Sequence, residues 1–174
     1  MKGYGLLQVY TGNGKGKTTA ALGVALRACG HGAKTLVLQF MKDDPGYGEY
    51  KAAGYLPGFE VRQIGRDCFV DFANPDPIDL AMVQDGWEIA KRALLEQKYD
   101  LLILDELNIA LAHNMLPVEE VVRFLKDNKG RTEVIATGRY APAPLIEAAD
   151  LVTEMQEVKH YFFAGIHSRD GIDH

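Results

Sequence analysis

A glycine-rich segment near the start of the chain, TGNGKGKTT at residues 11–19, constrains the fold more than any other feature. It separates a short apolar run (residues 6–10) from an alanine-rich run (residues 20–28) with the spacing of a helix. Glycine lets successive backbone amides turn inward around phosphate oxygens, and the first turn of the following helix adds its positive end. The segment therefore predicts a strand–loop–helix unit that binds a nucleoside triphosphate, with ATP as the expected nucleotide.

Within this loop, Lys17 supplies a point charge for phosphate and Thr18 is placed to offer its hydroxyl to a phosphate-bound magnesium ion. The match to the G-x-x-x-x-G-K-T motif has one departure, because Thr11 stands at the first glycine position. A glycine-rich turn without a ligand is the alternative, and Lys15 is equally well explained as a solvated loop lysine. The candidate nucleotide-binding residues are Gly12, Asn13, Gly14, Lys15, Gly16, Lys17, Thr18 and Thr19.

Apolar runs alternate with helical patterns along the whole chain. Strands are expected at residues 6–10, 35–40, 59–64, 101–104, 134–137 and 151–155, and helices at 20–28, at 77–98 and from 117 onward. Parallel strands need helical crossovers, so the pattern predicts an α/β protein. We expect a P-loop NTPase (RecA-like) three-layer fold with a mostly parallel sheet of about six strands. A length of 174 residues fits one domain, 1–174.

Two carboxylates follow the fourth expected strand. Asp105 and Glu106 end the run LLILDE, where a Walker-B acid would hold magnesium. The loops after parallel strands share one edge of the sheet, which brings these carboxylates to the glycine loop. The predicted metal ligands are Thr18, Asp105 and Glu106; capping of the next helix is the alternative role for either acid.

Arg139 follows the fifth expected strand and can reach the same edge to stabilise phosphate charge, unless it is a plain surface arginine. Asn128 and Lys129 suggest a guanine-reading motif, but Arg131 stands where that motif needs aspartate, so GTP is disfavoured. His113 is expected to end a helix rather than to catalyse.

Composition limits the remaining function classes. The formal net charge of -5 offers no basic field for nucleic acid or an anionic membrane surface. The chain enters a strand soon after Met1, without a leader or a membrane-spanning apolar run, so a cytoplasmic location is expected. Cys29 and Cys68 have no metal-ligand spacing and are interpreted as packing residues of a reduced chain.

The ordered motifs resemble the CobA/BtuR-type ATP:corrinoid adenosyltransferases almost from end to end. They are VYTGNGKGKTTAA (9–21), QF (39–40), GE (48–49), LDE (104–106), TGR (137–139), ADLVTEM (149–155), VKH (158–160), GI (165–166) and GID (171–173). The glycine loop alone is shared by many NTPases, whereas the TGR motif and the ADLVTEM and VKH run are more specific.

The resemblance implies an enzyme that transfers the 5'-deoxyadenosyl group of ATP to the cobalt of a reduced corrinoid and releases triphosphate. It implies Mg²⁺ (or Mn²⁺), a homodimer, and a reductase or flavoprotein that supplies electrons. Carried over by position, Lys17, Glu106 and Arg139 become the catalytic set, with Glu106 and Thr18 on magnesium. Lys159 and His160 are further candidates.

Two departures from the family pattern concern the corrinoid side. Some members carry an amino-terminal extension that covers the site, and this chain has almost none before its first strand. Some carry a phenylalanine and a tryptophan in the loop after the third strand, where this chain offers Phe69 and Phe72. We expect C5' of ATP to face the 65–72 loop. A RecA-like ATPase or switch, and a non-catalytic nucleotide or corrinoid carrier, are the alternative functions.

Overall fold

The computed structural model describes residues 3–174, and six parallel strands form one sheet in the order β3-β2-β4-β5-β1-β6. The strands are β1 (Leu7–Thr11), β2 (Thr35–Phe40), β3 (Phe59–Ile64), β4 (Leu101–Asp105), β5 (Glu133–Thr137) and β6 (Leu151–Glu154). Every residue of β2, β4 and β5 is buried, as expected for parallel strands covered on both faces. The predicted sheet is confirmed.

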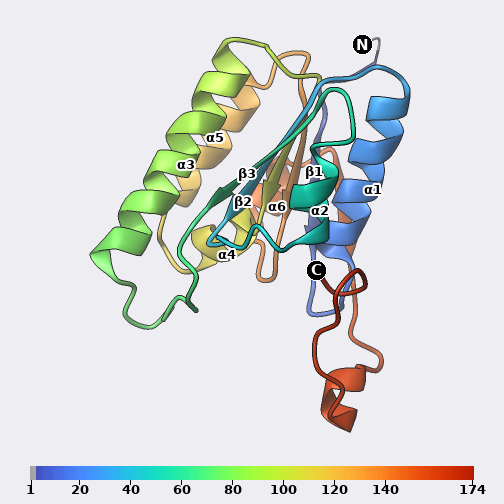
Figure 1. Ribbon diagram of the computed structural model, residues 1–174. Helices are drawn as coiled ribbons and strands as arrows, with labels where there is room; N and C mark the ends of the chain where they lie inside the picture. Colours follow the sequence, from blue (N-terminus) through green and yellow to red (C-terminus); the bar gives the residue numbers. More distant parts are fainter. Residues whose placement is uncertain (1–2) are drawn as a thin grey trace.

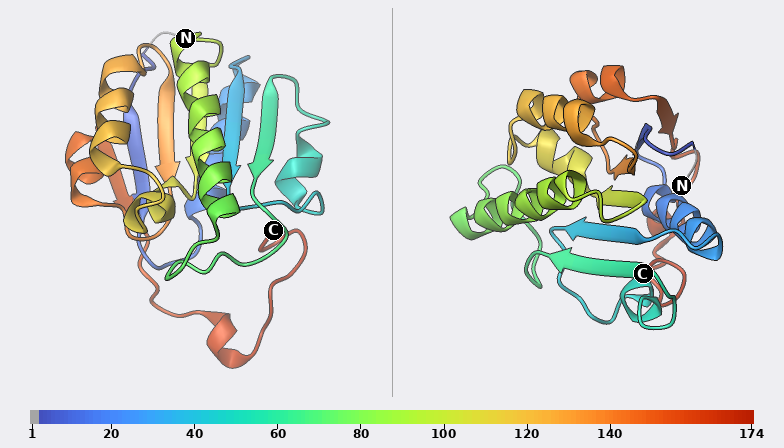
Figure 2. Two further views of the ribbon diagram at one scale, coloured as in Figure 1. Left: turned by 90° about the vertical axis from the view of Figure 1, so that its left-hand side faces the viewer. Right: turned by 90° about the horizontal axis from the view of Figure 1, so that it is seen from above.

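Helices cover both faces of the sheet (Figures 1 and 2). One face carries α1 (Lys17–Gly30) and α2 (Gly48–Ala52). The other carries α3 (Pro77–Leu95), α4 (Leu107–Ala112), α5 (Val118–Asn128) and α6 (Ala143–Ala148). Each face has its own apolar core, with Phe40 and Trp87 on the α3 side and Val37 and Ile103 on the α1 side. This is the three-layer arrangement that the sequence predicts.

Helix α3 begins where local chemistry predicts, whereas α1 begins at Lys17 rather than at residue 20. Asp76 caps α3 by accepting a hydrogen bond from the amide of Ile78 at 2.9 Å, and Pro77 is its first residue. His113 follows the last residue of α4, so its predicted place at a helix end is confirmed. The short helices α2 and α6 were not predicted, α4 was expected without bounds, and α3 ends at Leu95 rather than at residue 98.

One of the two cysteines departs from the prediction made for both. Cys29 is partly buried, but Cys68 is exposed in the loop after β3, so its interpretation as a packing residue is wrong. Between residues 3 and 174, no helix combines the length and the apolar character needed to cross a membrane.

Residues 155–174, here called the C-terminal tail, extend beyond the carboxyl edge of the sheet and contain one 3-10 turn, η1 (Tyr161–Ala164). Figures 1 and 2 show the tail looping away from the sheet before its end returns toward α1. The tail therefore reaches the edge at which parallel sheets bind ligands.

Two glycines offer a matched test of the α3 packing. A Cβ at Gly86 would lie 2.7 Å from a ring carbon of Phe40, which is fully buried, whereas a Cβ at Gly23 would meet no atom within 4 Å. Gly86→Ala is expected to lower the free energy of unfolding, because overpacking costs ~1–3 kcal/mol and outweighs the gain in helix propensity of ~1 kcal/mol. Gly23 also lies in a helix, α1, and Gly23→Ala should raise the free energy of unfolding. Urea unfolding of both variants checks this, and an unchanged or higher stability of Gly86→Ala would refute the packing argument.

Candidate functional site

The glycine loop is held in shape by the first residues of the C-terminal tail. Gly12 and Gly16 have φ values of 93° and 115°, which favour glycine. The amide of Gly14 donates to the carbonyl of Met155 at 2.7 Å, and a Cβ at Gly12 would lie 2.4 Å from the same oxygen. The loop therefore needs glycine both for its turn and for the close approach of residue 155.

Lys17 begins α1 and curls back over the loop. Its Nζ donates to the carbonyl of Gly14 at 2.6 Å, and only 9% of the residue is exposed. Burial lowers its pKa, with Arg139 acting in the same direction and the carboxylates of Glu106 and Asp105 opposing. An ammonium group with so little solvent contact gains most from a bound anion, which suits a phosphate partner.

Asp105 lies at the end of β4 and is fully buried. Its Oδ1 accepts hydrogen bonds from the hydroxyls of Thr18 (2.7 Å) and Thr137 (2.6 Å), and its Oδ2 pairs with Lys42 Nζ at 2.7 Å. Burial opposes its ionisation, but Lys42 and the two hydroxyls together hold its pKa below the ordinary value. Asp105 therefore acts on the loop through Thr18, and its carboxylate does not line the cavity described below.

Glu106 is the carboxylate that reaches the cavity. It precedes α4 with a φ of 67°, a left-handed conformation that is unusual for glutamate. Its amide donates to Thr137 Oγ1 at 3.1 Å, and its buried Oε2 has no hydrogen-bond partner among the described residues. Burial raises its pKa, and the neighbouring Asp105 adds to this. An unpartnered buried carboxylate oxygen calls for a cation or a donor from a ligand.

Three hydrogen bonds hold the turn that carries Arg139 and the neighbouring end of β1. The hydroxyl oxygen of Thr11 accepts from the amide of Ala141 at 3.2 Å, which ties the glycine loop to the turn after β5. Buried Asn108 donates to the carbonyls of Tyr10 (3.1 Å) and Gly138 (2.9 Å). Thr11, a departure from the motif, therefore has a structural role, and sequence reasoning missed Asn108 because a lone asparagine in a short helix carries no signal.

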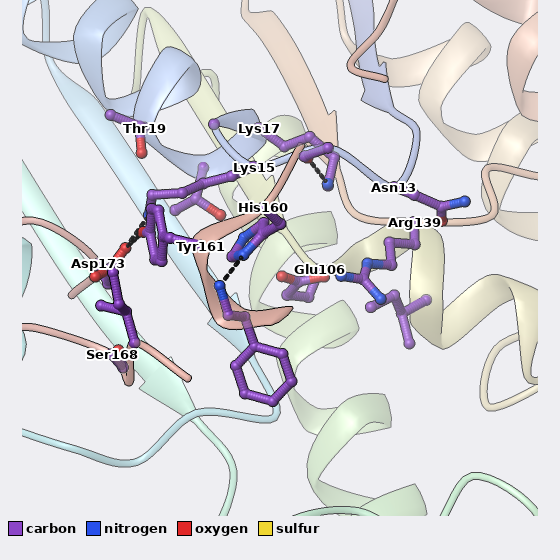
Figure 3. A pocket seen from close by; sticks show the side chains of 16 residues that line it. Asn13, Lys15, Lys17, Thr19, Glu106, Arg139, His160, Tyr161, Ser168 and Asp173 are labelled. Atoms are coloured by element: carbon purple, nitrogen blue, oxygen red, sulfur yellow. Dashed lines mark hydrogen bonds and ion pairs between the residues drawn. The ribbon is translucent and has the colours of Figure 1, made fainter. Parts of the chain in front are cut away.

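These residues surround a cavity of about 330 Å³. Figure 3 shows Lys17, Arg139 and Glu106 around it, with the Arg139 guanidinium directed toward the Glu106 carboxylate. The predicted residues that line it are Asn13, Gly14, Lys15, Gly16, Lys17, Thr18, Thr19, Glu106 and Arg139. Gly12 and Asp105 lie behind it and shape it.

The opposite wall belongs to the C-terminal tail. His160, Tyr161, Phe162, Ile166, Ser168 and Asp173 line the same cavity. Of the two tail candidates drawn from the resemblance, His160 lines the cavity, whereas Lys159 does not. Sequence reasoning named the VKH, GI and GID motifs but assigned no role to Tyr161 or Asp173. The GID motif, which contains Asp173, was the feature of the sequence that could have indicated its role in the cavity.

The two aromatic residues of the 65–72 loop have different surroundings. Phe72 stacks on His113 with ring centroids 4.5 Å apart and packs against the core. Phe69 is fully exposed beside a second cavity of about 280 Å³, which Met41, Lys42 and Arg66 also line. Only Phe69 is free to meet a large ligand.

The donor set fits magnesium held mainly by substrate phosphates. Within residues 3–174, no group of three or more His, Cys, Asp and Glu side chains is arranged to hold a metal ion. Thr18 and the unpartnered carboxylate of Glu106 both face the cavity. Magnesium is commonly bound by one or two protein oxygens together with phosphates and water, so these two groups match its needs.

The fold and the loop together define an α/β nucleotide-binding protein with a phosphate-binding loop. The family described as ATP:corrinoid adenosyltransferase BtuR/CobO/CobP matches residues 3–174, and the chain belongs to this family. The resemblance seen in the sequence motifs is thereby confirmed.

Curated relatives agree over most of their length. The corrinoid adenosyltransferase of Escherichia coli (strain K12) is 41% identical over 170 residues, covering 98% of this chain and 86% of that protein. The corrinoid adenosyltransferase of Pseudomonas aeruginosa is 38% identical over 169 residues, covering 97% and 83%. The solved structure of the flagellar accessory protein FlaH from Methanocaldococcus jannaschii matches with a TM-score of 0.59 and 11% identity, covering 87% of this chain and 71% of that chain. The last likeness concerns the fold alone.

Proposed function

We propose that this chain is an ATP:corrinoid adenosyltransferase, which transfers the 5'-deoxyadenosyl group of ATP to Co(I) of a reduced corrinoid in adenosylcobalamin synthesis or salvage. The observation that carries the proposal is the convergence of Lys17, Arg139 and Glu106 on one cavity, in a chain that belongs to this family. Both cations and an unpartnered carboxylate there suit a triphosphate with its metal.

The reaction makes modest demands on the protein. The Co(I) electron pair forms a bond to C5', the bond from C5' to the α-phosphate oxygen breaks, and its electron pair leaves with triphosphate. Because Co(I) is itself a strong nucleophile, the reaction needs no general base. The chain has to align the sugar carbon, neutralise the leaving group and exclude water. Lys17 and Arg139 neutralise the negative charge of the departing triphosphate, while the glycine-loop amides hold the phosphates.

For magnesium, we propose that Thr18 and Glu106 are the protein ligands and that Asp105 orients Thr18 from behind. The 2.7 Å hydrogen bond donated by the Thr18 hydroxyl to Asp105 leaves the threonine oxygen available on the cavity side. When bound, the ion supplies further positive charge for the departing triphosphate. Manganese has similar oxygen-ligand preferences and is the alternative ion.

We further propose that C5' faces the 65–72 loop. The exposed Phe69 ring and the second cavity beside it favour this side for a large planar corrinoid. An ATP-bound structure provides the test. A ribose directed into solvent away from residues 65–72 would rule this orientation out.

Incubation of the protein with ATP, magnesium and chemically reduced corrinoid tests the proposal. Triphosphate together with the cobalt–carbon chromophore is the expected result. ADP and phosphate would instead indicate a RecA-like ATPase or switch in which Glu106 orients water, an alternative favoured only by its unpartnered Oε2. Binding of both ligands without product would indicate a carrier. Omission of magnesium is expected to abolish product formation.

The assembly, location and partners of the enzyme are also proposed. We propose a homodimer in the cytoplasm that receives electrons through a reductase or flavoprotein and binds neither nucleic acid nor membrane. The net charge of -5 supports the absence of polyanion binding. Leu151 and Val152 of the edge strand β6 are exposed at 45% and 41%, which supports contact with a second copy. Light scattering at micromolar concentration tests the dimer.

A further inference from the structure

The last part of the C-terminal tail, residues 158–174, is attached to the body of the protein by few polar contacts. Among the ion pairs and hydrogen bonds of the described residues, one joins residues 158–174 to the body of the protein: Lys15 Nζ to Asp173 Oδ1, at 2.7 Å. The His174 ring also lies 5.2 Å from the Tyr47 ring. The other polar contacts of this segment connect residues within the C-terminal tail, such as Tyr161 with Asp173.

Apolar burial adds little to this attachment. Large apolar side chains of the tail remain largely exposed, including Val158 (93%), Phe163 (77%) and Phe162 (61%). Segments with few buried contacts open at low cost in free energy. The Lys15–Asp173 pair is therefore the main contact whose loss would free the end of the tail.

Asp173 occupies a place where phosphate charge is expected. Its side chain is only 9% exposed, and it lines the cavity together with the glycine loop. In Figure 3, Lys15 reaches from the loop to Asp173, away from Lys17 and Arg139. Lys15, Tyr161 and Arg169 all contact this carboxylate and hold its pKa far below the ordinary value, so it is anionic at neutral pH.

We infer that Asp173 is a built-in competitor of the triphosphate: it holds Lys15, and with it the end of the tail, until phosphate oxygens take over this lysine. Two carboxylates, Asp173 and Glu106, share the cavity wall with three cations, Lys15, Lys17 and Arg139. A metal ion can neutralise Glu106, but an incoming triphosphate that pairs with Lys15 leaves Asp173 with Arg169 as its remaining cation among the described residues and meets its carboxylate as a like charge. The tail is then released from the loop. This inference requires of the proposed function only that the cavity takes a triphosphate.

Calorimetric binding of inorganic triphosphate and of ATP tests the inference with two variants. Asp173→Asn is expected to bind both ligands with a Kd lower by roughly three- to five-fold, the scale of a partly exposed ion pair. Asp170→Asn is the matched control, because Asp170 is a fully exposed tail carboxylate paired with His174. It makes the same change in net charge and should leave Kd unchanged.

Three outcomes would overturn the inference: an unchanged Kd for Asp173→Asn, a higher one, or an equal fall in both variants. Hydrogen exchange supplies a second measurement on the wild-type protein. Exchange in residues 158–174 should increase when inorganic triphosphate binds, and a decrease or no change would also contradict release. If Asp173→Asn binds more tightly but neither the wild type nor the variants form adenosylated corrinoid, the inference stands and the proposed function fails.

Discussion

Replacement of Lys17 by alanine is expected to lower kcat/KM for adenosyl transfer by roughly 30-fold or more, a loss of transition-state stabilisation of about 2 kcal/mol. Lys17 lies inside the glycine loop, and its Nζ is 2.6 Å from the Gly14 carbonyl, where it can move onto a phosphate oxygen. Negative charge grows on triphosphate as the bond to C5' breaks. Removal of this buried cation therefore weakens binding of the transition state more than that of the substrate.

Initial rates of formation of the cobalt–carbon chromophore, at varied ATP and saturating reduced corrinoid, measure this effect. Lys126→Ala is the matched control, because Lys126 is exposed in the last turn of α5 and takes no part in the cavity. The control should keep wild-type rates. Near wild-type turnover by Lys17→Ala would mean that the loop does not hold the leaving group.

The sheet could be predicted because its strands are easily recognised in the sequence. The buried strands β2 and β4 are short, almost uninterrupted apolar runs, and each ends at a polar residue or a turn. The short helices left no comparable signal. α2 has 5 residues and none of them is buried, so it has no apolar stripe for the sequence to reveal. Periodicity needs several turns before it can be recognised.

The site was predicted as a set of residues rather than as a geometry. Asp105 and Glu106 are adjacent at the end of β4, and the sequence does not say which one faces the ligand. The answer depends on the left-handed backbone of Glu106, with a φ of 67°, and on the pairing of Asp105 with Lys42 across 63 residues of chain. Long-range pairing of this kind leaves no mark in local composition.

The tail shows a second limit of sequence reasoning. Its chain is irregular and most of it is exposed, so neither periodicity nor hydrophobicity distinguishes it from a solvated end. Its place in the cavity depends on contacts between residue 155 and the glycine loop and on the pair formed by Lys15 and Asp173. Motif reasoning singled out the segment, but only the structure shows what it faces.

Loss of the Asp105 carboxylate is expected to have the largest effect on stability. Asp105→Ala removes the partner of Lys42, and the Lys42 side chain is only 19% exposed, so water compensates its charge poorly. It also leaves the buried Thr137 hydroxyl without its acceptor. The breaking of a buried ion pair from one side costs ~3–5 kcal/mol, because the remaining charge is uncompensated. Urea unfolding monitored by circular dichroism measures this loss, and a midpoint equal to that of the wild type would contradict it.

The double variant Lys42→Met with Asp105→Leu separates the structural role of the pair from its role in the site. Removal of both charges is expected to recover most of the lost stability, because apolar side chains of similar size replace buried ion pairs well. Binding of ATP with magnesium should stay weak in this variant, because the Thr18 hydroxyl has lost the carboxylate that orients it. If binding recovered together with stability, Asp105 would serve only to keep β4, β5 and the Lys42 segment together. If stability alone recovered, the Asp105 carboxylate would be needed to set the position of Thr18 in the nucleotide site.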